Sequence, residues 1–307
     1  MSHFLAPVFD DGFFTSTPVH VALVLAVVTA VSASTVGIFT VLRGQAFAAE
    51  ANSDISTMGS SAAFLLGIPP LWGLLLVGVA GASAMEILGV QRVRGRDLAV
   101  GVVLGASLGL SALFIYLDST SSTSNGSSIT ILFGSAFATP ASTIPLALAL
   151  GAVAMAIVTV LYRPLLLSSI SPELAAAKGV RLRIIGGLYL IALALAAALS
   201  ALTIGTILAT ALLVGPAATA LRLTRRPLQA IGCAAAIGTV AMLVGIVLAY
   251  DSFRWPPAGH GWPVSFFVTA LILLFYILSD LVPGRSARQR APAPPDTAPA
   301  TLISTGG

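Results

Sequence analysis

The sequence predicts an all-α polytopic membrane protein with about nine transmembrane helices, within a range of eight to ten. Hydrophobic residues occupy 57% of the 307 positions and charged residues only 8%, whereas about 25% of a typical soluble domain is charged. The mean hydropathy is +1.00. A helix needs about 20 mostly apolar residues to cross a bilayer. Apolar runs near this length predict spans at 19–42, 47–67, 71–90, 98–117, 142–163, 184–202, 204–221, 228–249 and 264–282.

The remaining segments delimit this membrane domain. We expect residues 1–18 to form an extracytoplasmic N-terminus, residues 19–282 the transmembrane domain, and residues 285–307 a cytoplasmic tail. The tail is rich in Ala and Pro without any period, which predicts disorder. The segment 130–139 is too short to cross alone, so we expect it to begin the 142–163 helix or to be re-entrant.

Basic residues fall almost entirely on one side of the predicted spans. Of the fifteen Lys and Arg residues, only Arg254 falls on the other side. Cytoplasmic segments of membrane proteins carry the excess of Lys and Arg, which predicts an N-terminus outside the cytoplasm and a C-terminus inside it. The same asymmetry accounts for the net charge of +4, so this charge gives no indication of a nucleic-acid partner.

A short segment between two apolar runs has the residues of a capped helix. Ser171 can accept from the free amides of the first turn, Pro172 has no amide hydrogen to lose there, and Glu173 favours the positive end of the helix dipole. Gly179 suits the position after the last turn. Basic residues follow in 181–183, which predicts a cytoplasmic position. A capped helix at that depth suggests contact with a partner protein.

Two carboxylates lie inside the second apolar run. Glu50 and Asp54 are four residues apart and therefore share one helix face, and Asn52 and Ser53 offer further oxygen donors nearby. A carboxylate inside a membrane costs about 2.5–3.5 kcal/mol on insertion scales. A bound cation, a shared proton or a water-filled passage would offset this cost. The alternative for Glu50 is an interfacial charge close to Arg43.

The chain lacks the residues of the common soluble enzyme classes. A P-loop needs a Lys followed by Ser or Thr, but the sole lysine, Lys178, precedes Gly179. The three histidines, His3, His20 and His260, have neither metal-ligand nor catalytic-triad spacing. We therefore expect no enzymatic activity, no ATP hydrolysis and no permanently bound cofactor in this chain alone.

Several motifs match one protein family in their order and spacing, over residues 19–282. They are Val41-Leu-Arg-Gly44, Arg96-Asp97 with Gly101, Leu132-Phe-Gly-Ser135, the segment 168–183, and Ala211-Leu-Leu-Val-Gly-Pro-Ala-Ala-Thr-Ala220. Together these motifs resemble the permease subunits of ABC importers for zinc, manganese and iron. Within 168–183, the pattern Glu173, Ala175, Ala176 and Gly179 resembles the coupling loop through which a cytoplasmic ATPase moves such a permease.

The resemblance implies a fold related to the vitamin-B12 permeases and an importer in the bacterial plasma (inner) membrane. Two permease subunits, identical or different, would pair around a central pathway within the membrane lipid. A cytoplasmic ABC ATPase dimer would supply the energy of ATP, and an extracytoplasmic metal-binding protein would deliver the ion. The residues implied in ATPase coupling are Ser171, Pro172, Glu173, Ala175, Ala176 and Gly179.

The resemblance also implies a site for the transported metal. Family members commonly read Asp-Ala-Leu-Ser-His-Ala where this chain reads Glu50-Ala-Asn-Ser-Asp54-Ile. Glu50 and Asp54 become the expected metal ligands, and Asn52 and Ser53 become pathway residues. A carboxylate in place of the imidazole favours manganese or iron over zinc. Gly215 and Pro216 would kink their span, either as part of a moving gate or as a static bend.

Two alternative functions remain open at this point. Within the same fold, the chain would be a permease for a siderophore, haem or vitamin B12. In another class, it would be an ion-coupled secondary transporter in which Glu50 and Asp54 carry protons or sodium. The second alternative does not explain the capped loop, and no inverted repeat of the carboxylate pair occurs in the second half of the chain.

Overall fold

The computed structural model of the 307-residue chain describes residues 16–87, 96–121, 131–134, 136–254 and 261–281. The described residues form helices and no strand. Nine helices have 17 residues or more: α1 (Thr17–Leu42), α2 (Ala46–Leu65), α3 (Pro70–Ile87), α4 (Arg96–Ser121), α6 (Ile144–Val160), α9 (Leu182–Ile204), α10 (Thr206–Leu223), α11 (Pro227–Asp251) and α12 (Val264–Asp280). Four shorter helices are η1 (Ala141–Thr143), α7 (Tyr162–Ile170), α8 (Pro172–Ala177) and η2 (Ser252–Arg254).

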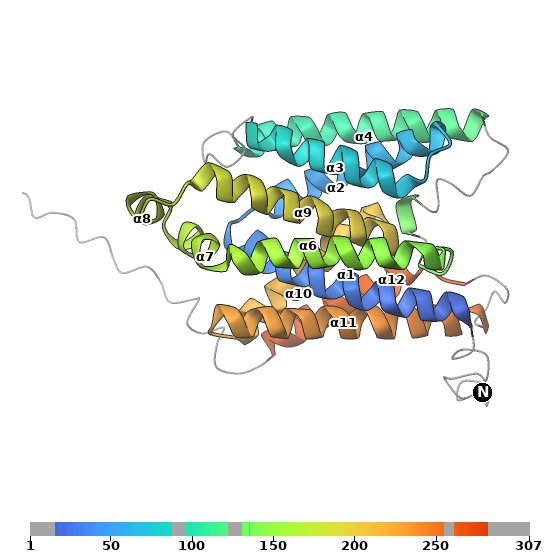
Figure 1. The fold of residues 1–307 in the computed structure, drawn as a ribbon. Helices are drawn as coiled ribbons and strands as arrows, with labels where there is room; N and C mark the ends of the chain where they lie inside the picture. The colour runs from blue at the N-terminus through green and yellow to red at the C-terminus, as the bar shows by residue number, and fades with distance from the viewer. Residues whose placement is uncertain (1–15, 88–95, 122–130, 135, 255–260, 282–307) are drawn as a thin grey trace, which may run out of the picture.

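The nine long helices lie side by side and successive ones run in opposite directions (Figure 1). Each predicted span corresponds to one of them, which confirms the all-helical membrane fold. Six of the described helices are long and apolar enough to cross a membrane: α1, α4, α6, α9, α10 and α11. The span counted for α6 includes η1, whereas the apolar stretches of α3 and α12 are shorter. The helix α2 carries the two carboxylates. That all nine cross the bilayer stays a prediction.

The helices α1 and α9 form the centre of the bundle. In each, 72% of the most apolar window is buried within the chain, compared with 17% in α4 and 22% in α6. Small residues allow the close packing that membrane helices require. At Gly37 of α1, an added Cβ atom would collide with the backbone carbonyl of Leu213 in α10. The two central helices therefore hold α10 in place beside α2.

The segment 130–139 differs from one of its two predicted forms. Residues 131–133 make one helical turn, and Pro140 and η1 separate this turn from α6. The segment therefore does not begin the α6 helix. Gly134 and Gly205 both have positive φ angles, +83° and +87°, and their backbones touch so closely that a Cβ on either would overlap the other segment. The segment thus packs on the turn between α9 and α10.

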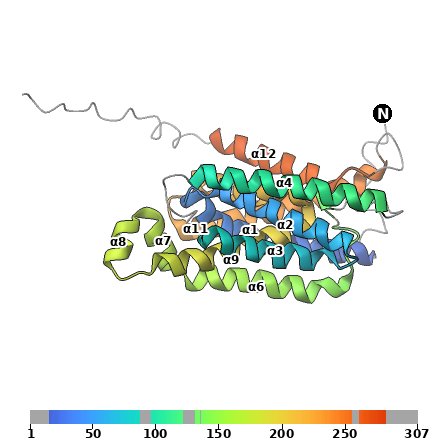
Figure 2. The same cartoon turned by 90° about the horizontal axis from the view of Figure 1, so that it is seen from above.

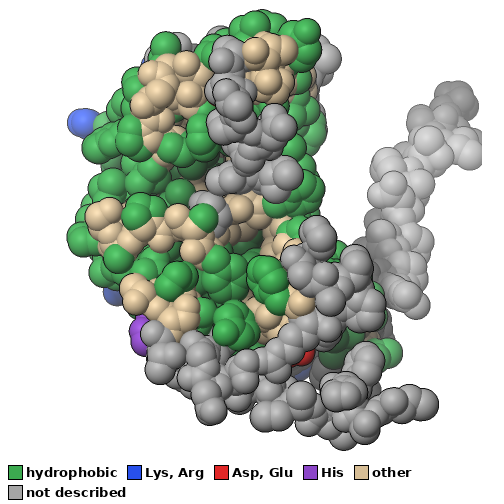
Figure 3. All heavy atoms as spheres, turned by 90° about the vertical axis from the view of Figure 1, so that its right-hand side faces the viewer, with side chains coloured by type: hydrophobic (Ala, Val, Ile, Leu, Met, Phe, Trp, Pro, Cys, Tyr) green, Lys and Arg blue, Asp and Glu red, His purple; other side chains and the backbone are tan. Residues whose placement is uncertain are grey.

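The basic residues gather at the end of the bundle that carries α8 (Figure 1). Eight of them lie at the ends of α1 and α10, in α7, in the connections that precede α9 and α11, and in the first turn of α9: Arg43, Arg163, Lys178, Arg181, Arg183, Arg222, Arg225 and Arg226. Viewed from the opposite end, the visible described side chains are mostly hydrophobic or uncharged (Figure 3). The fold therefore separates the two ends by charge, as the sequence predicts.

Candidate functional site

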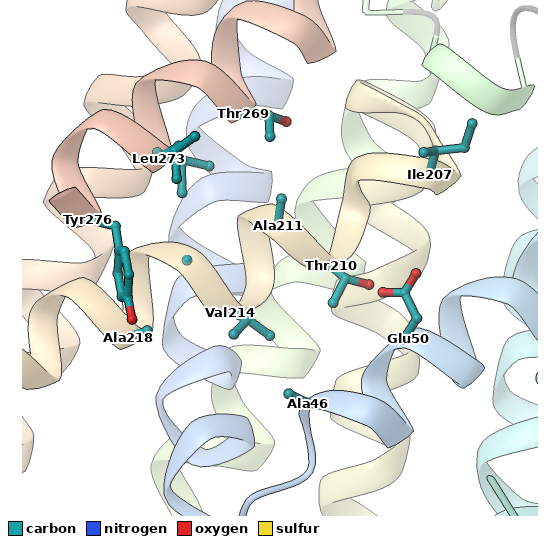
Figure 4. A pocket seen from close by; sticks show the side chains of 12 residues that line it. Ala46, Glu50, Ile207, Thr210, Ala211, Val214, Ala218, Thr269, Leu273 and Tyr276 are labelled. Atoms are coloured by element: carbon teal, nitrogen blue, oxygen red, sulfur yellow. The ribbon is translucent and has the colours of Figure 1, made fainter. Parts of the chain in front are cut away.

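Glu50 opens into a cavity of about 500 Å³ between α2, α10 and α12. Its polar lining consists of Glu50, Thr210, Thr269 and Tyr276, and the rest of the lining is apolar. The Glu50 carboxylate and the Thr210 hydroxyl point toward one another across the space between α2 and α10 (Figure 4). The Oγ1 atoms of Thr210 and Thr269 have no hydrogen-bond partner. The cavity is therefore lined by one carboxylate and by two threonines whose hydroxyl oxygens have no hydrogen-bond partner.

Asp54 opens into a second cavity, of about 490 Å³, between α2, α4 and α10. Asp54 is buried, with an exposed fraction of 8%. Hydroxyl groups of Thr57 and Ser111 lie in the same lining, and Ser111 Oγ has no hydrogen-bond partner. Ile207 lines both cavities. The two carboxylates therefore share one face of α2 but line different cavities, which have Ile207 in common.

Neither the Glu50 nor the Asp54 carboxylate has a salt-bridge or hydrogen-bond partner among the described residues. A charged group without a partner is costly in a low-dielectric interior. A cation or water in these cavities would offset that cost. No three His, Cys, Asp or Glu side chains of the described chain come together as a metal cluster. Serine and threonine hydroxyls are the further donors at hand, and they are hard oxygen ligands like the carboxylates.

Asn52 and Ser53 lie elsewhere on α2. An α-helix turns about 100° per residue, so the direction of Asn52 differs by about 160° from that of each carboxylate. It is fully buried, and neither atom of its amide group has a hydrogen-bond partner. Ser53 is also fully buried and donates to the Thr206 carbonyl oxygen of α10 at 3.3 Å. The structure therefore brings neither side chain to the two cavities.

Gly215 and Pro216 lie within α10, which runs through both residues without a break. Pro216 has no amide hydrogen, so the Leu212 carbonyl loses its usual helical donor. A Cβ atom at Gly215 would collide with the Ile272 side chain of α12. Gly215 and Ile272 both line the Glu50 cavity. The glycine therefore sets how closely α10 and α12 approach there, and a gating motion at this point stays a prediction.

Arg222, Tyr276 and Asp280 form a polar cluster near the α8 end of the Glu50 cavity. Arg222 of α10 donates to Asp280 of α12 at 2.9 Å and also to the Tyr276 hydroxyl. Its guanidinium carbon lies 3.9 Å from the centroid of the Tyr276 ring. Sequence reasoning missed Tyr276, Thr210 and Thr269. They are single polar residues in apolar helices, so no spacing marks them, and only the packing of α10 and α12 against α2 brings them to the cavity.

The short helix α8 has the caps that the sequence predicts. Ser171 Oγ accepts from the Leu174 amide at 3.3 Å. At the other end, Gly179 has a φ angle of +77°, and its amide donates to the Ala176 carbonyl at 2.9 Å. Val180 donates to Ala175 at 3.0 Å, which completes a Schellman motif. Pro172 and Glu173 occupy the first turn, and Ala175 alone of the helix is buried.

The helices α7 and α8 extend past the bundle at its basic end (Figures 1 and 2). Around α8, the Leu174 side chain is 48% exposed although it is apolar. Single exposed apolar side chains are common on protein surfaces. That a partner protein docks on α8 therefore stays a prediction.

Comparison with known proteins shows what this chain is similar to. It is 28% identical over 243 residues to the manganese import system permease protein ScaB of Streptococcus parasanguinis, covering 79% of this chain and 85% of ScaB. It is 29% identical over 246 residues to the manganese transport system membrane protein MntC of Halalkalibacterium halodurans, with 79% and 83% covered. It is 26% identical over 239 residues to the high-affinity zinc uptake system membrane protein ZnuB of Haemophilus influenzae, with 76% and 90% covered.

Two solved structures share the fold. PsaBC from Streptococcus pneumoniae in complex with Fab superposes with a TM-score of 0.76 at 24% identity, covering 89% of this chain and 94% of that chain. An inward-facing metal-chelate type ABC transporter superposes with a TM-score of 0.70 at 14% identity, with 88% and 87% covered. The sequence model of the ABC 3 transport family matches residues 17–278, and the chain therefore belongs to that family.

Proposed function

We propose that this chain is the membrane permease subunit of an ATP-driven importer for a divalent transition metal, with manganese or iron favoured over zinc. The family and the manganese and zinc permeases among its relatives support this proposal. The observation that carries it is the pair of carboxylates in α2. Each lacks a protein counter-charge among the described residues and opens into a cavity lined with hydroxyl groups. A transported cation supplies the missing charge.

The order of the two cavities along the bundle gives the path a direction. The Asp54 cavity extends along α4 to Tyr116 and Ser119, near the end opposite α8. The Glu50 cavity extends to Ala218 and Tyr276, near the α8 end. An imported ion would meet Asp54 first, pass Ile207, and then reach Glu50. Two weak sites in series allow binding and release, because neither site holds the ion too tightly to leave.

The chemistry of the donors supports the choice of metal. Carboxylate and hydroxyl oxygens are hard ligands, which suit manganese and iron(II) better than sites built from imidazole or thiolate. The metal is cargo, so its site need not be complete in one conformation. A second permease subunit across the pathway would add donors in the assembled transporter. An extracytoplasmic binding protein would deliver the ion, and an ATPase dimer docked on α8 would drive alternation between the two open states.

The test is manganese uptake into vesicles that contain the reconstituted complex with its ATPase and binding protein. The double variant Glu50→Gln with Asp54→Asn keeps the shape of both side chains but removes both charges, and we expect it to reduce ATP-driven uptake to background. Asp251→Asn is the matched control, because that carboxylate ends α11 and lines neither cavity. Full uptake by the double variant would refute the pathway. Uptake driven by an ion gradient without ATP would instead favour a secondary transporter.

A further inference from the structure

A polar cluster lies where α1, α7 and α9 meet, at the end of the bundle that carries α8. Arg43 follows the last turn of α1, and Gly44, with a φ angle of +61°, turns the chain toward α2. Arg43 Nη1 donates to Ser168 Oγ of α7 at 3.1 Å. The guanidinium carbon lies 5.1 Å from the centroid of the Tyr189 ring of α9. The Arg43 side chain therefore links the end of α1 to two other helices, α7 and α9.

The cluster extends into the core of the bundle. The Tyr189 hydroxyl and Thr40 Oγ1 are 2.7 Å apart, and both side chains are fully buried. Burial lowers the pKa of the Arg43 guanidinium, whereas Tyr189 and the Glu86 carboxylate of α3 raise it. An arginine remains protonated under such conditions. Arg43 thus brings a permanent charge to a site that is tied to α1, α3 and α9 on one side and to α7 on the other.

The helix α7 leads directly into α8 and connects it to the bundle. Only Ser171 separates the two helices, and Ala175 of α8 is buried while its neighbours are exposed. Leu165 of α7 is fully buried, and the Phe39 and Tyr162 rings meet edge to face at 6.0 Å. These apolar contacts hold α7 against the bundle without the directionality of a hydrogen bond. The hydrogen bond from Arg43 to Ser168 is directional, so it fixes the register of α7 against α1.

We propose that Arg43 is a positioning residue that transmits the movement of the α7–α8 unit to the central helices α1 and α9. The inference rests on the proposed function, in which an ATPase moves α8. When α8 is displaced, α7 moves with it, and the Ser168–Arg43–Tyr189 chain of contacts carries the displacement into the two helices at the centre of the bundle. Those helices pack on α2 and α10, which line the cavities of Glu50 and Asp54.

The geometry requires an arginine. A planar guanidinium can stack on an aromatic ring with its face while it donates from its edge, and a lysine ammonium is a compact point charge that cannot hold both contacts in this way. Arg43→Lys therefore retains the charge but loses the simultaneous contact with Tyr189 and Ser168. Ser168→Ala removes the acceptor for Arg43 and also the hydrogen bond that the Ser168 hydroxyl donates to the Leu165 carbonyl of its own helix at 3.0 Å. Both changes are small enough to leave the fold intact.

The experiment measures manganese ions transported per ATP hydrolysed, with the complete transporter in vesicles. We expect Arg43→Lys and Ser168→Ala each to lower this ratio by about fivefold, the lower end of the usual coupling between two sites. The double variant should be no worse than the more severe single variant, because both changes break one link. Arg163→Lys, an exposed arginine of α7, and Ser200→Ala, whose hydroxyl donates within α9 at 2.9 Å, are the controls.

Two measurements separate coupling from stability. Copurification of the ATPase and the melting temperature should match the wild type in both variants. A wild-type ratio in Arg43→Lys and Ser168→Ala would overturn the inference. So would a parallel fall of uptake and hydrolysis with a lower melting temperature, because that result assigns Arg43 a purely structural role. If the wild-type chain binds no ATPase, the proposed function itself is wrong. That result differs from the two outcomes above, which concern only the variants.

Discussion

At the scale of single residues, the sequence reveals the two carboxylates but not the hydroxyl groups beside them. Glu50 and Asp54 are visible in the sequence because a charge inside an apolar run is costly and rare. Thr210 and Thr269 carry no such signal, since a threonine is common in membrane helices. They reach the Glu50 cavity through the packing of α10 and α12. Asn52 is a different case, because its position two residues from each carboxylate already places it on another face of an α-helix.

Thr210 offers the first prediction at this scale. Its Oγ1 atom faces Glu50 and has no hydrogen-bond partner, so it is suited to donate to the carboxylate or to bind the passing ion. Thr210→Val keeps the shape and removes the oxygen, and we expect the KM for manganese uptake to rise about tenfold, equivalent to about 1.4 kcal/mol. Thr210→Ser should stay close to wild type. Thr219→Val is the control, because that hydroxyl donates to the Gly215 carbonyl of its own helix. Equal KM values in Thr210→Val and wild type would exclude a role for the hydroxyl.

Asp54 offers the second prediction. Replacing it with histidine introduces an imidazole, a softer ligand that suits zinc better than a carboxylate does. In competition uptake with equal concentrations of the two ions, Asp54→His should therefore increase the ratio of zinc to manganese transported. Asp54→Asn provides the comparison, since it removes the charge without adding a nitrogen ligand. An unchanged ratio in the histidine variant, with uptake still active, would place Asp54 outside the coordination of the ion.

At the scale of elements, local signals and tertiary contacts are predicted with different success. The caps of α8 follow from residues within one turn, so Ser171 and Gly179 are readable from the sequence. The segment 130–139 is not, because its conformation depends on the contact between Gly134 and Gly205, 71 positions apart in the numbering. The boundary of α6 shows the same limit. The α6 helix ends at Val160 and α7 begins at Tyr162, whereas the predicted span continues to residue 163.

The coupling role of α8 is tested at Gly179. Its positive φ angle lies in open space, so Gly179→Val meets no neighbour but strains the backbone by about 1–2 kcal/mol. We expect the variant to distort the end of α8, to weaken copurification with the ATPase and to reduce uptake. Gly67→Val is a matched control, because Gly67 also has a positive φ angle, +69°, in open space at the end of α2. Both variants should lose similar stability. If Gly179→Val, normally expressed, binds its ATPase and supports full uptake, α8 is not the docking element.

At the scale of the whole molecule, alternation of the helices links the predicted topology to the fold. Nine long helices that run in alternate directions place the first residue of α1 and the last residue of α12 at opposite ends. The sequence could predict this arrangement because length, hydropathy and the distribution of arginines depend only on the bilayer. It could not predict which helices form the centre. That follows from small residues such as Gly37, whose contact with Leu213 is a property of the assembled bundle.

The orientation in the membrane gives the last prediction. The α8 end carries the basic residues and should face the cytoplasm, because Lys and Arg are retained there during insertion. A chain cut after residue 121 has made four passes, so a reporter fused there should be active outside the cytoplasm. A reporter fused after Arg290 follows nine passes and should be active only inside.

The pair of fusions also tests the number of spans, since a helix that fails to cross reverses the location of every later residue. Both reporters on one side would therefore contradict nine crossings, and exchanged locations would contradict the orientation while preserving the parity of the bundle.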